Sequence, residues 1–556
     1  MRASTVLLAA ATMIGPVSSV LAQGPADQLL RLAPPDSGAT LVVEDLRGRI
    51  TEVLDSPLYR GLIDLPGVQA FRASSRFADL RRASADIERT LGVDLATIRD
   101  RLLGTAVVLS LVPGDGAPGG LLLVKVADRA LLDRLIKAAN DAEMGAVGPL
   151  LQVETRTHQG VSFRVRTFRP GTKPPEAYAI LDGDIFAWSG TERLIRDAIE
   201  RQRGPAPGLA ADPRFLKVQQ ALPAGALASL YVDPRFVERA AVTPATQPKG
   251  ERVAAAFRRY LGAMEYTGLA LEWRDGPTFH QFETLDPAKL DEPVRRGGAA
   301  PGASPSLLAR VPAGAVAVAA TGVDWPAWVD AVASILEPTD VPRLDALLLI
   351  ARGLLMGKDP RGEVLPKLGP GLVAYLDAPA DGPWPVALAF EARPEVADAV
   401  DNALRTALAF AALVAGEGGG QVPKLVEETA GGVRSTRLVG GPRGVVYAMG
   451  PGVVALGNDL ASATAFAVGT SRGSPSLESL RRARFPEARS FAAVDLIALG
   501  RWAGPRRDAL GHRLGVDPAD VGQALDAVGL LRAAYIAGEI GPGYAWVRRT
   551  AGVVGR

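Results

Sequence analysis

The chain has 556 residues, of which 48% are hydrophobic and 22% are charged, and its formal net charge is +2. This composition provides enough apolar surface for two domains, and the balanced charge argues against a nucleic-acid-binding protein, whose basic residues would gather in patches. The absence of cysteine excludes disulfide bonds, thiol chemistry and a lipid anchor on a cysteine.

The N-terminus has the three regions of a secretory signal peptide. Arg2 precedes an apolar run at residues 6–14, and short residues suited to cleavage follow at 20–22. The run is too short to span a bilayer, and a short buried helix is the alternative interpretation. We expect export to remove residues 1–22, so that the mature chain begins at Gln23 and is periplasmic or extracellular.

The first predicted module begins with a strand that ends at Asp45 and continues into helical segments. Residues 91–104 (LGVDLATIRDRLLG) are typical of a short helix closed by a glycine. Two apolar, β-branched runs follow at 107–112 and 121–126, separated by turn-forming residues. This pattern predicts a β-hairpin.

A helix and a second hairpin are predicted next. Asp128 stands at a helix N-cap position, and apolar residues recur behind it at helical spacing. Residues 161–167 alternate between apolar and polar, which predicts a strand with one face in water. Residues 178–188 form a hairpin that turns at 182–184, and its helix begins near Thr191.

The first half closes with a strand at 227–232 and a hairpin at 266–285. The next residues, 292–306 (EPVRRGGAAPGASPS), have the proline, glycine and small residues of a linker. We therefore predict a first repeat half at 23–291 and a second at 307–556.

The second half repeats the first at an offset of about 265 residues. The matched pairs are Gly92 with Gly357, Asp94 with Asp359, Gly104 with Gly369, and the dipeptide at 276–277 with that at 541–542. A finer unit, in which a strand ends in Asp and a helix and hairpin follow, occurs four times. Its aspartates are Asp45, Asp233, Asp324 and Asp495. The pattern predicts an internal duplication.

Together these features resemble a bacterial family of exported proteins that is catalogued only as a domain of unknown function. The signal peptide, the strands that end in Asp and the run at 91–104 that leads into a hairpin carry the resemblance. It covers nearly all of the mature chain as two tandem copies, and it implies no catalytic residues. The sequence departs from the pattern near Gly262, where no Asp follows as Asp94 follows Gly92.

The predicted fold class is α+β, with duplicated halves of antiparallel hairpins in one or two large sheets and amphipathic helices packed on one face. Outside the signal peptide, the longest apolar stretches lie at 344–356 and 403–416. Both contain charged residues, so we expect no transmembrane span in the mature chain.

The sequence carries no recognisable catalytic or metal-binding signature. His158, His280 and His512 are the only histidines, and they lie too far apart for the spacing of a zinc site, although one histidine paired with a carboxylate is an alternative. Motifs of the common hydrolases are absent, and the glycine run at 416–420 lacks the Lys and the Ser or Thr of a phosphate-binding loop. We assign no catalytic, cofactor-binding or metal-binding residue and expect no cofactor.

Two sets of carboxylates allow alternative interpretations. Asp182 and Asp184 could bind calcium, but a tight hairpin turn also selects Asp. The four strand-ending aspartates could be catalytic, but each precedes a helix, where an Asp accepts hydrogen bonds from free main-chain N–H groups. We interpret the first pair as turn residues and the four as helix caps.

Two aromatic pairs, Trp325 with Trp328 and Tyr544 with Trp546, could line a groove. Packing in the core is the more frequent role of such residues. We interpret both pairs as core residues.

We predict an exported, cofactor-free protein that binds an apolar ligand or an envelope protein through an apolar surface between sheet and helices, or that serves the cell envelope structurally. The stretches 344–356 and 403–414 motivate this prediction, because they are more apolar than one helix face against a sheet requires. Their complete burial is the alternative. The competing functional class is a hydrolase whose active site carries no recognisable motif. Nucleic acid is not an expected partner.

Overall fold

The computed structural model describes residues 24–114, 118–144, 148–236, 251–302, 305–377, 385–416, 423–439, 445–470 and 475–556. The predicted signal peptide and Gln23 lie outside these residues, as does most of the glycine run at 416–420. The chain divides into two compact units. Unit 1 contains the segment that ends at Ser37, Leu41–Arg47 and Val93–Asp212, and unit 2 contains Gly38–Thr40, Gly48–Gly92 and Pro213–Arg556.

Antiparallel strands and helices form both units, which confirms the predicted α+β fold class. In unit 1 the strands are hydrogen-bonded in the order β4-β5-β6-β7-β3-β2. These strands are β2 (Ala106–Val112), β3 (Gly119–Lys125), β4 (Leu150–His158), β5 (Val161–Phe168), β6 (Glu176–Leu181) and β7 (Ile185–Ser189). The residues of β1 (Ala39–Glu44) are divided between the two units.

The helices that include residues of unit 1 are α1 (Pro25–Leu30), α2 (Leu46–Asp55), α6 (Leu95–Arg101), α7 (Arg129–Glu143) and α8 (Glu192–Arg203), with a short 3-10 turn at Leu209–Ala211. Asp94 caps α6 by accepting a hydrogen bond from the Thr97 N–H at 2.7 Å, and Asp128 caps α7 by accepting one from Leu131 at 2.9 Å. The predicted N-cap of α7 is confirmed.

The predicted hairpins of unit 1 are present. β2 pairs with β3 from Ala106 opposite Lys125 to Val112 opposite Gly119, and β6 pairs with β7. Gly183 and Asp184 in the three-residue β6–β7 loop have φ of 79° and 55°, the left-handed region that Gly, and more readily than most residues Asp, can adopt. The turn thus accounts for the residue types at 182–184.

The predicted wet face of β5 needs a correction. Ser162 and Arg164 are exposed, but Arg166 on the same face is buried. Its guanidinium donates to Glu176 on β6 at 2.5 Å and also to Glu143 on α7. A buried charge needs such partners, and the alternation in sequence does not reveal that α7 closes over this end of the strand.

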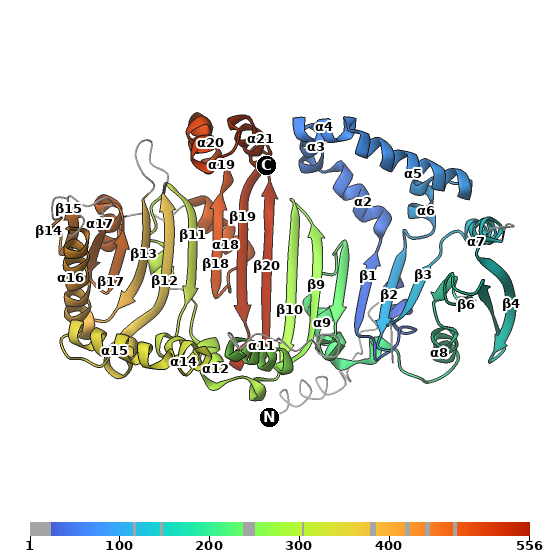
Figure 1. Ribbon diagram of the computed structural model, residues 1–556, viewed down its shortest axis with the longest axis horizontal. Coiled ribbons are helices and arrows are strands. Elements are labelled where there is room, and N and C mark those ends of the chain that lie inside the picture. Colours follow the sequence, from blue (N-terminus) through green and yellow to red (C-terminus); the bar gives the residue numbers. More distant parts are fainter. Residues whose placement is uncertain are drawn as a thin grey trace, which may run out of the picture. The chain divides into compact units, whose positions relative to one another are not determined.

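The strands of unit 2 are hydrogen-bonded in the order β8-β9-β10-β20-β19-β18-β11-β12-β13-β17-β16-β15-β14 (Figure 1). They are β8 (Ala228–Val232), β9 (Met264–Trp273), β10 (Pro277–Leu285), β11 (Ala315–Gly322), β12 (Leu368–Asp377), β13 (Val386–Ala392), β14 (Lys424–Ala430), β15 (Val433–Val439), β16 (Val446–Gly450), β17 (Val453–Gly457), β18 (Ser490–Asp495), β19 (Leu531–Ile540) and β20 (Trp546–Gly555).

Unit 2 also contains helices on both sides of unit 1 in the sequence. They are α3 (Pro57–Asp64), α4 (Pro66–Ala73), α5 (Ser75–Leu91), α9 (Pro213–Ala221), α11 (Glu251–Ala263), α12 (Glu292–Ala299), α13 (Pro305–Leu308), α14 (Trp325–Ile335), α15 (Val341–Leu354), α16 (Pro394–Gly416), α17 (Leu460–Val468), α18 (Pro475–Arg484), α19 (Leu496–Ala503), α20 (Arg507–Leu514) and α21 (Pro518–Gly529), with short turns at Pro287–Lys289, Pro360–Val364, Leu365–Lys367, Gly504–Arg506 and Pro542–Tyr544. Among the described residues, none of these helices combines the length and the apolar composition needed to cross a membrane.

The two sequence halves meet in the sheet of unit 2. β10 of the first half pairs with β20 of the second, with Thr278 opposite Gly552 and Thr284 opposite Trp546. Strand order also recurs between the halves. The order β2-β3-β7-β6-β5-β4 in unit 1 corresponds to β12-β13-β17-β16-β15-β14 in unit 2, and β8-β9-β10 corresponds to β18-β19-β20.

One face of the unit 2 sheet carries a large core. Side chains from β11, β12, β13, β18 and β19 pack there against α13, α17 and α18. Its members include Val318, Val373, Tyr375, Phe466, Leu477, Leu480, Phe485, Phe491 and Tyr535. Tyr375 and Phe466 stack with ring centroids 5.5 Å apart. The opposite face of the same strands is not part of this core.

The segment predicted to be a linker is folded between Glu292 and Ala299, where it forms α12. This helix contacts α14 and the turn Pro542–Tyr544, and Arg296 on it donates to Asp330 at 2.6 Å. Pro293 is tolerated because it occupies the first turn, where no intrahelical donor is needed. Composition alone does not reveal these partners.

The strand-ending aspartates differ in what they bind. Asp324 and Asp495 are N-caps, accepting hydrogen bonds from Ala327 at 2.8 Å and Ala498 at 2.9 Å. Asp233 is buried and accepts from the Arg235 N–H at 3.0 Å while pairing with the Arg235 and Arg214 guanidinium groups. Asp45 has φ of 51°, and its own N–H donates to Thr105.

Because Asn accepts the same main-chain hydrogen bond as Asp, Asp324→Asn should change the thermal unfolding midpoint little, whereas Asp324→Ala should lower the unfolding free energy by about 1 kcal/mol. Thermal unfolding followed by circular dichroism compares the three proteins. If Asp324→Asn lowered the unfolding midpoint as much as Asp324→Ala, the carboxylate charge, and not the capping hydrogen bond, would stabilise this helix.

Candidate functional site

A floor of small side chains lies on the open face of the unit 2 sheet. Ala319 on β11 is opposite Ala374 on β12 and Ala492 on β18. Larger side chains stand at both sides of this row, because Ala374 is opposite Leu388 on β13, and Ala492 is opposite Ile536 on β19. Small residues between large ones leave a hollow.

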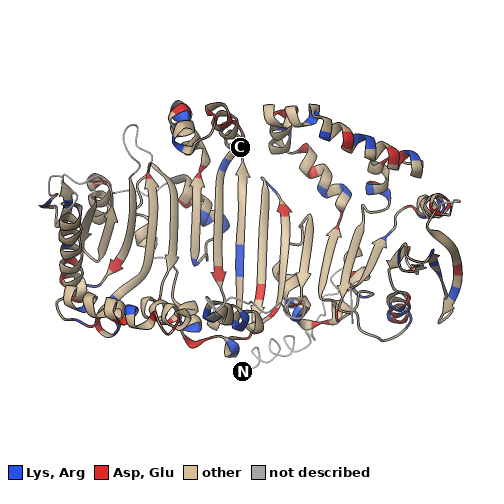
Figure 2. Ribbon diagram, in the orientation of Figure 1, with Lys and Arg blue, Asp and Glu red and all other residues tan. Residues whose placement is uncertain are grey.

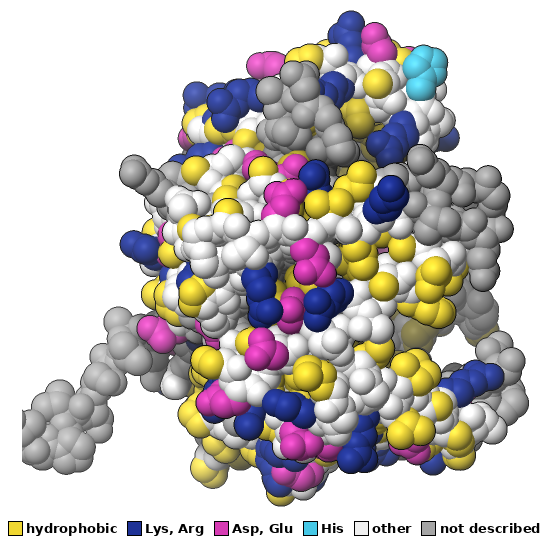
Figure 3. All heavy atoms as spheres, turned by 90° about the vertical axis from the view of Figure 1, so that its left-hand side faces the viewer, with side chains coloured by type: hydrophobic (Ala, Val, Ile, Leu, Met, Phe, Trp, Pro, Cys, Tyr) yellow, Lys and Arg dark blue, Asp and Glu magenta, His cyan; other side chains and the backbone are white. Residues whose placement is uncertain are grey.

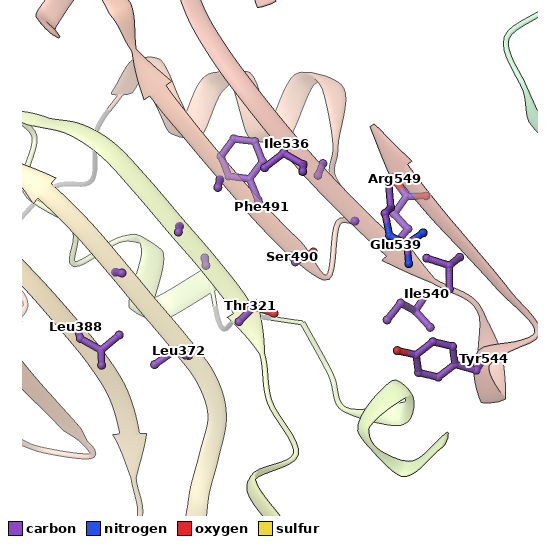
Figure 4. A pocket seen from close by; sticks show the side chains of 17 residues that line it. Thr321, Leu372, Leu388, Ser490, Phe491, Ile536, Glu539, Ile540, Tyr544 and Arg549 are labelled. Atoms are coloured by element: carbon purple, nitrogen blue, oxygen red, sulfur yellow. The ribbon is translucent and has the colours of Figure 1, made fainter. Parts of the chain in front are cut away.

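The hollow consists of two adjoining cavities of about 440 Å³ and about 490 Å³. They share Ala319, Ala374, Ala492 and Ile536. Figure 4 shows the first cavity, with Leu372 and Leu388 on one side and Ile536 and Ile540 on the other. We call the two cavities together the groove. Their sizes fall within the range of small-molecule sites, roughly 300–1,000 Å³.

The groove exposes apolar side chains that no described helix covers. Ile536 is 53% exposed and Leu388 is 42% exposed. Figure 1 shows α19–α21 at one end of the strands and α11, α12 and α14 at the other. Figure 2 shows that the middle of β11, β12, β18 and β19 bears no charge. An exposed apolar patch of this kind marks an interaction or ligand site.

Charged and phenolic groups gather at one end of the groove. Glu283 on β10 is only 1% exposed, and it accepts hydrogen bonds from Arg549 on β20 at 2.8 Å, from Gln281 at 3.2 Å and from Tyr260 on α11. Burial and the bond to Glu283 raise the pKa of Tyr260 well above its usual range. Burial lowers the pKa of Arg549, but its bond to Tyr260 and the charge of Glu283 outweigh this effect, so the net shift is upward.

Tyr544 lines the same end, and in Figure 4 its hydroxyl points into the cavity, near Ile540. Burial raises the pKa of Tyr544, while Arg489 and Arg549 oppose that shift. Arg489 donates to the carbonyl oxygens of Gly297 and Gly298 at the end of α12. The predicted linker therefore packs against Tyr544, which lines the groove.

The histidines lie outside the groove and do not come together. His158 in unit 1 is 2.8 Å from Glu200, and His280 on β10 is 3.0 Å from Glu272. His512 lies exposed on α20. Burial lowers the pKa of His280 despite the neighbouring Glu272. Within the described ranges, no three His, Asp or Glu side chains are grouped as metal ligands.

The aromatic pairs separate in space. Trp325 packs edge-on against Phe390 with centroids 6.2 Å apart, whereas Trp328 is exposed. Trp546 stacks on Phe282 at 5.7 Å, whereas Tyr544 lines the groove. The interpretation as core residues is thus wrong for Trp328. Tyr544 is half-buried and packs against the buried cluster that includes Leu285 and Leu290, and it also lines the groove.

The apolar helices at 344–356 and 403–414 are not fully buried. Leu349 on α15 is 70% exposed, and Phe410 on α16 is 68% exposed. The two helices contact each other, and Asn402 donates to the Leu354 carbonyl at 2.8 Å. Figure 3 faces the end of unit 2 that carries them and shows hydrophobic side chains among charged ones. Neither helix lines the groove, so this apolar surface is separate from it.

Unit 1 contains a polar hollow of about 730 Å³ between α7 and the β4–β6 strands. Its charged lining residues include Arg129, Asp133, Lys137 and Asp141, which form ion pairs within α7. These exposed pairs are typical of a solvated helix surface. The hollow therefore gives no indication of a ligand comparable to that of the groove.

The groove residues were missed by the sequence analysis, which sought nucleophiles, metal ligands and phosphate loops. A signal for them exists in the strand AVAVAATG at Ala315–Gly322, where every second residue is small. Small residues alone do not show which face of a strand is open, because the core face also contains Ala315 and Ala320. The open face is defined only by the packing of α13, α17 and α18 on the other side.

Comparisons with known proteins give little further information. No family model matches the chain, and no curated protein matches it. Two solved structures are similar, crystal forms III and I of TP0453, each with 14% sequence identity over 48% of this chain. They are matched over 83% and 82% of their own lengths, with TM-scores of 0.24 and 0.25. Likeness at this level supports no conclusion about this protein.

Gly298 tests how closely α12 packs at the polar end. A Cβ at Gly298 would fall on the Tyr544 ring, whereas a Cβ at the neighbouring Gly297 would meet nothing within 4 Å. Gly298→Ala should therefore cost about 1–3 kcal/mol of unfolding free energy through overpacking. Gly297→Ala is the matched control and should leave stability equal or slightly higher, because it restricts the unfolded chain. Equal thermal unfolding midpoints of the Gly298→Ala and Gly297→Ala proteins would contradict the close packing of Gly298 against Tyr544.

Proposed function

We propose that this is an exported protein of the cell envelope that acts by binding an apolar ligand in the groove of unit 2, without chemical conversion of that ligand. The observation that supports this proposal most directly is the floor formed by Ala319, Ala374 and Ala492 between larger aliphatic side chains. A ligand that covers the exposed Ile536 and Leu388 removes apolar surface from water. The gain in binding free energy is roughly 25 cal/mol per Å² of buried surface.

The N-terminal residues support the exported location in this proposal. Arg2, the apolar run at 6–14 and the short residues at 20–22 are typical of a signal peptide. Because an exported apolar ligand carrier works in water, its ligand has to be shielded by the protein surface. A groove with hydrocarbon walls shields the side of the ligand that faces the sheet.

We further propose that the halves are two copies of one ancestral module, as the offset of about 265 residues in the sequence suggests. The matching strand orders support this proposal. The module near Gly262 differs, because α11 runs through Gly262 to Ala263 and leads directly into β9. The missing Asp after Gly262 is consistent with the lack of a separate helix start there.

Filling the groove provides the test. Ala319→Phe places a large ring on the floor of the groove at an exposed strand position, where an aromatic residue is compatible with the strand. We expect its affinity for the neutral dye Nile red to fall by at least about tenfold, a change of ~1.4 kcal/mol. Fluorescence titration of the purified mature protein measures this affinity.

Ala430→Phe is the matched control, because Ala430 is an exposed strand residue on β14 that does not line the groove. It should bind Nile red like the wild type. Organic extraction of the protein from its native host, followed by mass spectrometry, should yield an apolar compound that incubation with the protein leaves intact. Wild-type affinity in Ala319→Phe, or conversion of the compound, would refute the proposal.

A further inference from the structure

The groove changes chemically along its length. Its first row across the strands is apolar and includes Ala317, Val494 and Ala534. The middle row contains the alanines of the floor, and the third row contains Thr321, opposite Ser490. From Ala317 to Thr321 the chain advances about 13 Å, at roughly 3.3 Å per strand residue.

The third row ends at a cation. Ser490 is opposite Gly538 on β19, and Gly538 is opposite Arg549 on β20. Since Gly538 has no side chain, the path along this row from Ser490 to Arg549 contains no bulky group. Arg549 keeps 43% of its side-chain surface exposed, although it is paired with the buried Glu283. It therefore has donor surface available to the groove.

A second cation acts on the same end. The Arg489 guanidinium is held by two main-chain carbonyl oxygens of α12, and among the described residues no carboxylate forms an ion pair with it. Asp324, whose charge also acts on Arg489, is engaged at the N-cap of α14. Arg489 and Arg549 both oppose the rise in the Tyr544 pKa, and Glu283 favours it. Glu539, which also lines the groove, is paired with Arg548 at 3.1 Å.

The width of the hollow limits what can lie in it. The small-residue floor spans β12, β11 and β18, so its outer strands are about 10 Å apart, at roughly 4.8 Å per strand. Leu388 and Ile536 bound the middle row on its two sides. This width suits one hydrocarbon chain rather than a ring system or a bundle of chains.

We propose that the groove binds a single-chain anionic amphiphile, with its tail over the alanine floor and its carboxylate or phosphate head group at Arg549 and Tyr544. This assignment rests on the function proposed above and adds the chemical class of the ligand. The Arg549 guanidinium and the Tyr544 hydroxyl donate hydrogen bonds to the head group. Arg489 fixes the end of α12 and contributes positive charge. Hydrogen bonds to a charged head group are stronger than hydrogen bonds between neutral groups.

Isothermal titration calorimetry with oleate and oleyl alcohol, below micelle-forming concentrations, separates the head group from the tail. We expect the wild type to bind oleate at least about tenfold more tightly than oleyl alcohol, the factor expected for one charge-assisted hydrogen bond. Raising the salt concentration should weaken oleate binding alone. Inorganic phosphate should not displace oleate. Displacement at millimolar phosphate would indicate a site for the free anion and overturn the assignment.

The charges of Arg549 and Glu283 are removed together, because Glu283 without Arg549 would be a buried carboxylate without an ion-pair partner. The double variant Arg549→Gln/Glu283→Gln should bind oleate about tenfold more weakly and oleyl alcohol unchanged. Tyr544→Phe, which changes no charge, should weaken oleate binding by several-fold. Arg482→Gln is the matched control, since Arg482 is an exposed cation on α18 away from the groove.

The outcomes separate the two proposals. Equal affinity of the wild type for oleate and oleyl alcohol, or a double variant with unchanged preference for oleate, would overturn the head-group assignment and leave the groove as an apolar site. Failure of the wild type to bind either compound would overturn the proposed function as well. Ala319→Phe should lose affinity for both compounds, which places the tail on the floor of the groove.

Discussion

Every second side chain of an antiparallel strand faces the same side of its sheet, and both the core and the groove of unit 2 depend on this alternation. On β11, Val318 and Ala320 face α13, α17 and α18, whereas Ala317 and Ala319 face the groove. The same division holds on β18, where Phe491 and Ala493 belong to the core. A shift of one residue in register would exchange the two faces and expose the core.

Patterns of neighbouring residues made the helices and strands predictable. Alternating and β-branched runs, with turn residues at 182–184, predicted the hairpins, and Asp128 and Asp324 mark helix starts because a carboxylate satisfies free N–H groups. These signals act over a few residues. The burial of Arg166, the packing of α12 and the place of Tyr544 beside the groove depend on residues far away in the sequence, so local patterns do not reveal them.

The groove was unpredictable for a related physical reason. An alanine on a strand fits a crowded core and an open hollow equally well, and only the presence or absence of a covering helix distinguishes the two. Ala389 and Ala319 lie on neighbouring parts of one sheet, yet the first is buried and the second is exposed. The predicted apolar surface between sheet and helices therefore differs from the groove, which lies on the opposite face of the strands from α17 and α18.

The pairing of β10 with β20 also has a consequence for folding. Paired residues on these strands are separated by 262 (284 to 546) to 274 (278 to 552) positions in the chain, so this contact is among the least local in the protein. At a synthesis rate of roughly 5–20 residues per second, β10 precedes β20 by some tens of seconds. During that interval one edge of β10 is open, and an open edge close to exposed Phe279 and Leu269 favours association with other chains. The interval before β20 pairs with β10 is therefore the stage of folding at which the first half is most open to aggregation.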